Sequence, residues 1–153
     1  MGLDQYLYAK RFSSPSFESE KETYEQIIEA MNARDFMGNA PFPYTTVSVT
    51  VGYWRKQNAI HQWFVDNCQD GNDDCRDAFV AREQLEELRD LCKQVLADKS
   101  LASDLLPTSE GFFFGGTDYD EWYIQGLEYT VKLIDDLLAK VPNEWDFVYG
   151  SSW

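Results

Sequence analysis

Arg55 and Lys56 are an adjacent basic pair in a chain that carries 27 acidic and 13 basic residues. The pattern around them predicts that a strand ends here and that a helix over residues 55–67 begins, and helix N-termini attract anions. On such a helix, Arg55, Asn58 and Gln62 share one face and present hydrogen-bonding groups together. We therefore consider a small anionic or nucleotide-like ligand flanked by aromatic rings. The candidate ligand-binding residues are Trp54, Arg55, Lys56, Asn58, His61 and Gln62.

The alternative for this segment is a solvent-exposed helix face on which the basic pair offsets nearby acids. Short polar patterns of this kind often occur by chance. The alternative is therefore preferred, and a ligand site that uses Arg55, Asn58 and His61 is the second hypothesis.

His61 is the only histidine of the chain, and a catalytic base would need an orienting partner. Within one helical turn the sequence offers only the uncharged Gln57, Asn58 and Val65. A Cys–His pair with Cys68 would require the helix to continue further than its pattern predicts. We assign no catalytic residue, and we expect His61 to pack as a polar residue or to complete a buried hydrogen bond.

The polar segment Asp66–Asp77 partly resembles a calcium-binding loop, with acids at its first, fifth and twelfth positions and Gly71 at the sixth. It departs from that pattern at the third, eighth and twelfth positions, where Cys68, Asp73 and Asp77 stand. A zinc site built from the histidine and the nearby cysteines lacks both C-x-x-C spacing and a fourth ligand. We therefore predict a polar turn, with no metal and no cofactor.

Acidic residues are concentrated in the last third of the chain. Residues 100–153 hold ten acids and two lysines, whereas the formal net charge of the whole chain is −14. Such carboxylates can imitate a phosphate array and occupy the basic groove of a partner, although net acidity also serves solubility alone. The candidate acidic partner-binding face is Asp118, Asp120, Glu121, Glu128, Asp135 and Asp136.

This charge balance argues against direct binding to nucleic acid or to an anionic membrane surface. No apolar run approaches the length of a membrane span, and no N-terminal signal peptide is recognisable. The chain has three cysteines, an odd count that is typical of reduced thiols in a cytosol. We therefore expect a cytoplasmic protein.

With 153 residues, of which 44% are hydrophobic, the chain can form one domain with its own core. Capping-box patterns at Ser19/Glu22 and Asp118/Glu121 predict two helix starts. Periodicity predicts strands over residues 3–11 and 45–52, and helices over about 19–31, 55–67, 79–98 and 118–141. The apolar run 111–116, which is too short for periodicity to decide, is interpreted as a buried strand, and residues 146–149 as a last edge strand. The expected fold is α+β: a single domain over residues 1–153, with about four helices packed on a small, mostly antiparallel sheet.

Phe112, Phe113 and Phe114 form a short apolar run between glycines. Three adjacent aromatic side chains must bury surface somewhere, so we expect a core strand. The floor of a binding cleft is the alternative.

Several strings spread over nearly the whole chain resemble one family of small, uncharacterised bacteriophage and prophage proteins. They include Met1-Gly-Leu-Asp, Val51-Gly-Tyr-Trp-Arg-Lys, Arg82-Glu-Gln-Leu-Glu-Glu-Leu and Gly111-Phe-Phe-Phe-Gly. The resemblance implies a phage or prophage origin and assigns no role to any residue. Some members carry the label phosphoglycerate kinase, which these residues do not support, because the chain has no G-x-x-x-x-G-K phosphate loop and no second domain to form a cleft.

Together, these patterns favour a phage-encoded, non-catalytic acidic protein that binds a host macromolecule, most simply a host protein, during host takeover or counter-defence. Mimicry of nucleic-acid charge is one way in which it could act. The alternative is a binder of a small anionic ligand or nucleotide, or an enzyme, that uses the segment around Arg55.

Overall fold

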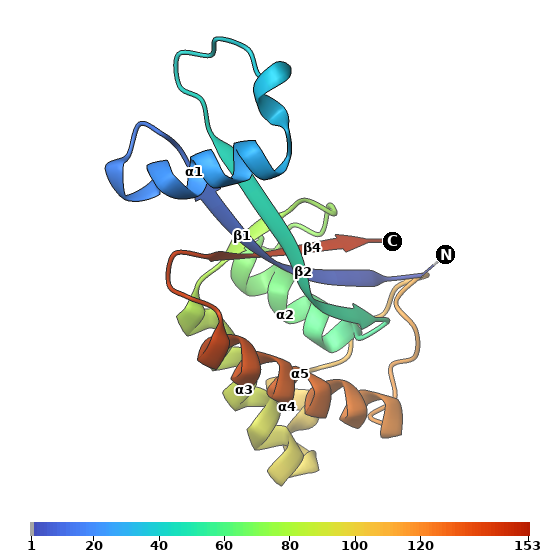
Figure 1. The fold of residues 1–153 in the computed structure, drawn as a ribbon. Helices are drawn as coiled ribbons and strands as arrows, with labels where there is room; N and C mark the ends of the chain where they lie inside the picture. Colours follow the sequence, from blue (N-terminus) through green and yellow to red (C-terminus); the bar gives the residue numbers. More distant parts are fainter. Residues whose placement is uncertain (1) are drawn as a thin grey trace. The chain divides into compact units, whose positions relative to one another are not determined.

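The computed structural model describes residues 2–153 (Figure 1). These residues form five α-helices and one four-stranded antiparallel sheet with the strand order β2-β1-β4-β3, which confirms the α+β class. The helix beyond the four that the sequence predicts is α4, a short helix just before Pro107. The elements are β1 (Asp4–Ser13), α1 (Glu18–Ala30), β2 (Thr45–Arg55), α2 (Asn58–Cys68), β3 (Ala78–Val80), α3 (Arg82–Ala97), α4 (Ala102–Leu105), α5 (Glu121–Lys140) and β4 (Asp146–Ser152).

The chain divides into two compact units. The first comprises the N-terminal residues up to Ala9 together with Thr50–Trp153, and the second comprises Lys10–Val49. The strands β1 and β2 each contribute residues to both units. The expectation of one domain over residues 1–153 stays a prediction, and each unit is described by itself.

The core of the first unit forms between the strands and the helices α2, α3 and α5. The ring of Phe64 on α2 stacks on that of Tyr149 on β4, with centroids 4.0 Å apart, so α2 packs against the sheet. Figure 1 shows α3 and α5 side by side. Their apolar stripes, which include Leu88 and Leu127, are buried as the helical spacing predicts.

The second unit has a small apolar cluster of its own. On α1, Tyr24 and Ile28 are buried together with Ala33 of the following 3-10 turn, and Met37 packs against them. Within this unit the hydroxyl oxygens of Ser13 and Thr45 lie 2.7 Å apart and link β1 to β2.

Three helix starts differ from the sequence prediction. The first helix begins at Glu18, and its N-cap residue Phe17 makes no side-chain capping bond, so the capping box predicted at Ser19 is wrong. The helix predicted from residue 55 begins instead at Asn58, because the strand before it continues to Arg55. The last long helix is capped by Asp120, whose carboxylate accepts a hydrogen bond from the Tyr123 N–H at 3.1 Å, and not by Asp118.

The strand predicted around the three phenylalanines is also wrong, because residues 112–114 form a turn. The Phe114 N–H donates to the Gly111 carbonyl at 3.0 Å, which closes the turn. Gly115 then adopts a φ of +90°, a left-handed conformation that favours glycine. Phe112 is 96% exposed whereas Phe114 is buried, so the run does not form a core strand.

A three-residue strand was missed at the start of the third predicted helix. Residues Ala78–Val80 pair antiparallel with β4, with Phe79 opposite Val148, and α3 begins only at Arg82. A short apolar segment next to a helical pattern is easily taken as part of the helix. The strand is recognised only from its pairing with β4.

Candidate functional site

The last residues of β2 form one wall of a groove on the first unit. Trp54 is 2% exposed, and its indole N–H donates to the Thr130 hydroxyl on α5 at 2.9 Å. Successive side chains of a strand point to opposite faces. Tyr53 and Arg55, on either side of Trp54, are therefore exposed, and Trp54 fixes this end of β2 to α5.

The other wall is one face of α5. Trp122, Gln125, Gly126 and Tyr129 are spaced i, i+3, i+4 and i+7 and therefore share this face. Trp122 is 55% exposed and Tyr129 is 42% exposed, which is unusual for such large rings. The Tyr129 hydroxyl accepts a hydrogen bond from the Tyr53 N–H at 3.3 Å and so joins the two walls.

Between these walls lies a groove of about 280 Å³, which we call the aromatic groove. Half of its lining residues are tyrosine or tryptophan, and two glutamines and one arginine supply its polar side chains. Its lining residues are Tyr53, Trp54, Arg55, Gln57, Trp122, Gln125, Gly126 and Tyr129.

Gly126 of α5 lies directly against the side chain of Gln57. A Cβ atom at this glycine would lie 2.1 Å from the Gln57 side-chain oxygen, closer than real contacts allow. The absence of a side chain lets the Gln57 amide reach across and donate to the Trp122 carbonyl at 3.0 Å. The floor of the groove therefore depends on a glycine inside a helix.

Asp4 on β1 holds the exposed residues of β2. Its Oδ1 atom accepts hydrogen bonds from the Tyr53 hydroxyl at 2.5 Å and from the Arg55 guanidinium at 2.9 Å. The bond to Asp4 raises the pKa of Tyr53, and the bond to Tyr53 together with the charge of Asp4 raises that of Arg55. The guanidinium at the groove is therefore already paired with a carboxylate.

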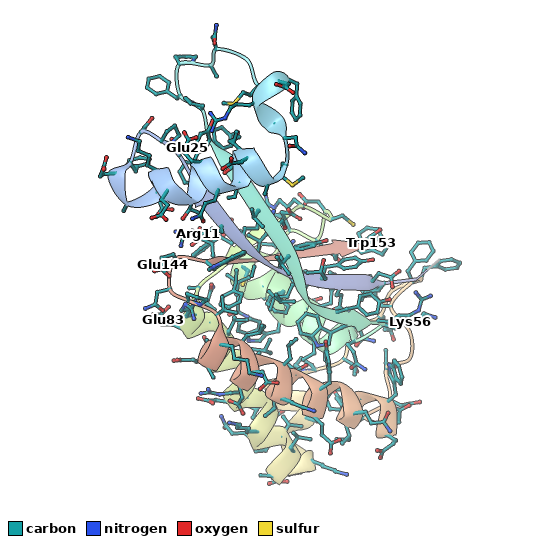
Figure 2. The ribbon with its side chains drawn as sticks, viewed as in Figure 1. Arg11, Glu25, Lys56, Glu83, Glu144 and Trp153 are labelled. Atoms are coloured by element: carbon teal, nitrogen blue, oxygen red, sulfur yellow. The ribbon has the colours of Figure 1, made fainter. Side chains whose placement is uncertain are left out.

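A smaller polar recess of about 100 Å³ adjoins the aromatic groove and shares Gln57 and Trp122 with it. Lys56, Asp118 and Asp120 are the charged residues of its lining. Lys56 has a φ of +54° and forms the turn between β2 and α2, as Figure 2 shows. The basic pair thus lies between a strand and a helix N-terminus, as predicted, but Arg55 belongs to the strand and shares no helix face with Asn58.

Asn58 and Gln62, the other predicted donors, hold the loop before α5. The Asn58 amide donates to the carbonyls of Phe114 at 3.2 Å and Gly116 at 2.8 Å, and its oxygen accepts from the Ser109 N–H at 3.0 Å. The Gln62 oxygen accepts from the Ser109 hydroxyl at 3.1 Å. These amides position a loop, and Asn58 itself is only 3% exposed.

His61 is completely buried, and both of its ring nitrogens have partners. Its Nδ1 atom lies 2.7 Å from the Tyr149 hydroxyl, and its Nε2 atom lies 2.9 Å from Asp73 Oδ2. The Tyr149 hydroxyl also lies 3.3 Å from the Gln5 side-chain oxygen. The orienting carboxylate that the sequence around His61 lacked is thus Asp73, from the following loop.

Burial raises the pKa of Tyr149 well above its ordinary value, and the charge of Asp73 adds to the effect. The other Asp73 oxygen accepts from the Trp153 indole N–H at 3.1 Å. This chain of hydrogen bonds fastens β4 and the residue after it, Trp153, which is labelled in Figure 2, to the loop after α2. Its His61 and Tyr149 side chains are buried in the core, whereas Trp153 is exposed, and none of its residues lines the aromatic groove.

The six residues of the predicted acidic face differ in their surroundings. Asp120 caps α5, Asp136 pairs with Lys140 at 3.2 Å, and Asp135 lies 3.3 Å from both Arg89 and Lys93. The remaining acids, Asp118, Glu121 and Glu128, are exposed and form no ion pair with any described residue. These three acids therefore lie just before α5 or in its N-terminal half, which also carries Trp122 and Gln125 of the aromatic groove.

In the segment Asp66–Asp77, which resembles a calcium-binding loop, several polar side chains form hydrogen bonds within the segment or with α2. Asp66 accepts from Gln62, Asp73 accepts from His61, and the Gln69 amide donates to the Arg76 carbonyl. Within residues 2–153, no three His, Cys, Asp or Glu side chains are grouped so that they could hold a metal ion. The three cysteines are free thiols.

Comparison of the chain with protein-family models, with curated proteins and with solved structures finds no match. In the part of the chain that the structure describes, no helix combines the length and the apolar character needed to cross a membrane. The aromatic groove and the acids beside it are therefore interpreted from their own geometry.

Proposed function

We propose that the protein is a non-catalytic, phage-encoded protein that binds a basic segment of a host protein in the host cytoplasm. The binding surface is the aromatic groove together with Asp118, Glu121 and Glu128. The observation that carries this proposal is the exposure of three large aromatic rings, those of Tyr53, Trp122 and Tyr129, around one groove.

The composition of the groove is that of a protein-binding hot spot. Trp, Tyr and Arg are enriched among the residues whose truncation costs most binding energy. Trp and Tyr bury large areas with few rotatable bonds. Here Trp122 and Tyr129 stand on a helix, and Tyr53 is held by Asp4. A partner side chain that enters the groove therefore meets rings that are already in position.

The negative charge beside the groove favours a partner that carries positive charge. Glu121 is the first residue of α5 and Glu128 lies two turns later, both on the side next to Gln125, and Asp118 lines the adjoining recess. Lysine or arginine side chains of a partner would pair with these carboxylates and pack on the tryptophan face. This arrangement favours a basic segment that also carries an apolar or aromatic side chain.

The internal bonds of the predicted donors support a non-catalytic role. His61 is fully buried, and Asn58 and Gln62 are occupied in holding a loop. A general base must reach its substrate within hydrogen-bond distance, and His61 lines neither the groove nor the recess beside it.

The test is affinity capture from host lysate with the wild-type chain and the variant Trp122→Ala, at about 50 mM and about 500 mM salt. We expect the wild type to retain a basic protein at low salt and to release it at high salt. Removal of a hot-spot side chain costs about 2 kcal/mol or more, which is about 30-fold in Kd, so Trp122→Ala should lose the partner.

Phe79→Ala is the matched control, because Phe79 is 61% exposed but lies on β3, outside the groove. It should capture the same partner as the wild type. The double variant Glu121→Gln/Glu128→Gln should weaken capture at low salt only. Capture that is equal for all variants would refute the proposed surface.

Arg55 at the groove wall is the one observation that favours an anionic ligand or nucleotide. Such a ligand would have to compete with Asp4 for the guanidinium. Thermal melting with mononucleotides separates the two functions. A rise in Tm that Arg55→Gln abolishes would support the small-ligand function, and no rise would favour protein binding.

A further inference from the structure

A long uncharged stretch lies in a chain in which 26% of residues are charged. From Phe36 to Trp54 the sequence contains no Asp, Glu, Lys, Arg or His. Its first part, up to Val49, belongs to the second unit and includes the loop before β2 and the first half of that strand. The sequence of β2 itself alternates Thr or Ser with Val, which favours strand formation.

This stretch is apolar and exposed in the second unit. Behind two of its aromatic rings lies a hollow of about 210 Å³, lined among others by Ile28, Met37 and Phe42. Isolated exposed apolar residues need no explanation, but a group of them on one segment marks an interaction site. The exposed members are Phe36 at 76%, Phe42 at 78%, Tyr44 at 65% and Val49 at 46%.

The same segment forms an unprotected sheet edge. β2 is the terminal strand of the sheet, so one row of its N–H and C=O groups has no strand partner. Natural edge strands carry lysine, proline or bulges that prevent pairing with another chain, and none of the residues from Thr45 to Trp54 is a lysine or a proline. In the first unit, the edge N–H of Tyr53 is already used by the Tyr129 hydroxyl. The free part of the edge is therefore Thr45–Val49.

The distribution of charge makes this edge the part of the surface where a second acidic copy would meet the least repulsion. The second unit has six acidic and four basic residues, and Arg11 and Arg34 pair with Glu20 and Glu25 inside it. The rest of the chain carries nearly all of the net charge of −14. Two copies of this chain repel each other over most of their surface, but not where two uncharged edges meet.

We propose that Thr45–Val49 pairs antiparallel with the same segment of a second copy of this chain and forms a symmetric dimer. An antiparallel pair of identical strands is self-complementary. If residue i of one copy faces residue j of the other copy, then residue j of the first copy also faces residue i of the second. The flanking Phe42 and Tyr44 then cover apolar surface on the second copy. This inference does not depend on the proposed function.

The experiment measures the mass of the full-length chain in solution by light scattering over a range of concentrations. We expect the mass to rise from 17.8 kDa towards twice that value as concentration increases. Added salt should favour the dimer, because salt screens the repulsion between two acidic copies. That dependence is opposite to the one expected for the basic partner.

Val49→Lys and Thr46→Lys each place a lysine on the exposed edge and should keep the chain at the mass of one copy. Phe79→Lys is the matched control, because it adds a lysine to β3, the opposite edge strand, and should leave the dimer intact. Circular dichroism of all three variants shows that each is folded.

A wild-type chain that stays at the mass of one copy at every concentration would overturn the proposal. A dimer that survives both Val49→Lys and Thr46→Lys would also overturn it, because the interface would then lie elsewhere. Pairing of this edge with a strand of a host protein, seen as a complex that contains one copy of this chain and is lost in Val49→Lys, would replace the second copy as its occupant.

Discussion

The Nδ1 atom of His61 lies 2.7 Å from the hydroxyl of Tyr149, 88 residues later in the sequence, and both side chains are fully buried. Because the Nε2 atom faces the carboxylate of Asp73 at 2.9 Å, the tautomer that donates there accepts from Tyr149 at Nδ1. This bond joins α2 to β4 through the core. It gives the single histidine a structural role, and it places a polar pair where an apolar core would be expected.

Tyr149→Phe should lower the free energy of unfolding by about 1–3 kcal/mol, because it leaves the buried His61 nitrogen without a donor. Urea unfolding followed by circular dichroism measures the change. Tyr119→Phe is the control, because this hydroxyl lies on an exposed residue and accepts only a 3.4 Å contact from Thr108. It should change stability by less than about 0.5 kcal/mol. Equal stability of wild type and Tyr149→Phe would contradict the structural role.

Stability should fall as pH rises through about 10. Burial raises the pKa of Tyr149 well above that of a tyrosine in the unfolded chain. Above pH 10 the unfolded chain therefore loses a proton that the folded chain keeps, which favours unfolding. Urea midpoints measured between pH 8 and 11 should decline more steeply for the wild type than for Tyr149→Phe. Parallel declines would show that Tyr149 does not titrate differently in the two states.

Gly126→Ala should destabilise the protein, against the ordinary helix preference. In a helix interior, alanine is favoured over glycine by about 1 kcal/mol. Here the new Cβ would lie 2.1 Å from the Gln57 oxygen, so the buried Gln57 side chain must shift and give up its hydrogen bond to the Trp122 carbonyl. Leaving these buried polar groups without partners costs about 1–3 kcal/mol, which exceeds the gain in helix preference. Thermal unfolding gives the sign. Gly116→Ala is the control, because a Cβ there meets no atom within 4 Å, and a gain in stability for Gly126→Ala would contradict the close contact.

The three cysteines should react with iodoacetamide in a fixed order at pH 8. Burial raises the pKa of both Cys68 and Cys92 to about 12, and Cys92 is completely buried, so neither presents a reactive thiolate. Cys75, in the loop after α2, should be modified first, as mass spectrometry of proteolytic fragments would show. All three should react in denaturant. Early modification of Cys92 in the folded protein would mean that the core opens around it.

Local patterns predicted most of the regular elements. Alternation of valines with threonine or serine gave the strand from Thr45, which extends to Arg55. Helical spacing in the last long helix predicted the buried Ile124, Leu127 and Ile134. These predictions succeed because burial of one face requires a fixed spacing within a single element. The strand predicted over Phe112–Phe114 was wrong, because three adjacent apolar residues contain no spacing that distinguishes a strand from a turn.

The candidate site was only partly accessible from the sequence. Arg55 was selected as a member of the basic pair and Trp54 as its neighbour, and both line the aromatic groove. Trp122 and Tyr129 were missed, although their spacing of seven residues places them on one helix face. Their exposure could not be inferred, because a stripe of aromatic residues at helical spacing more often packs into the core.

The sequence by itself determined the α+β class, the approximate positions of the main helices and strands, and an excess of negative charge in the last third of the chain. Each of these follows from neighbours along the chain or from a count of residues. Tertiary structure decided which side chains meet: Tyr53 with Tyr129, His61 with Tyr149 and Asp73, and Gln57 with Gly126. These contacts depend on the order of strands in the sheet and on the approach of α5 to β2, and no local pattern encodes distances between residues that are far apart in sequence.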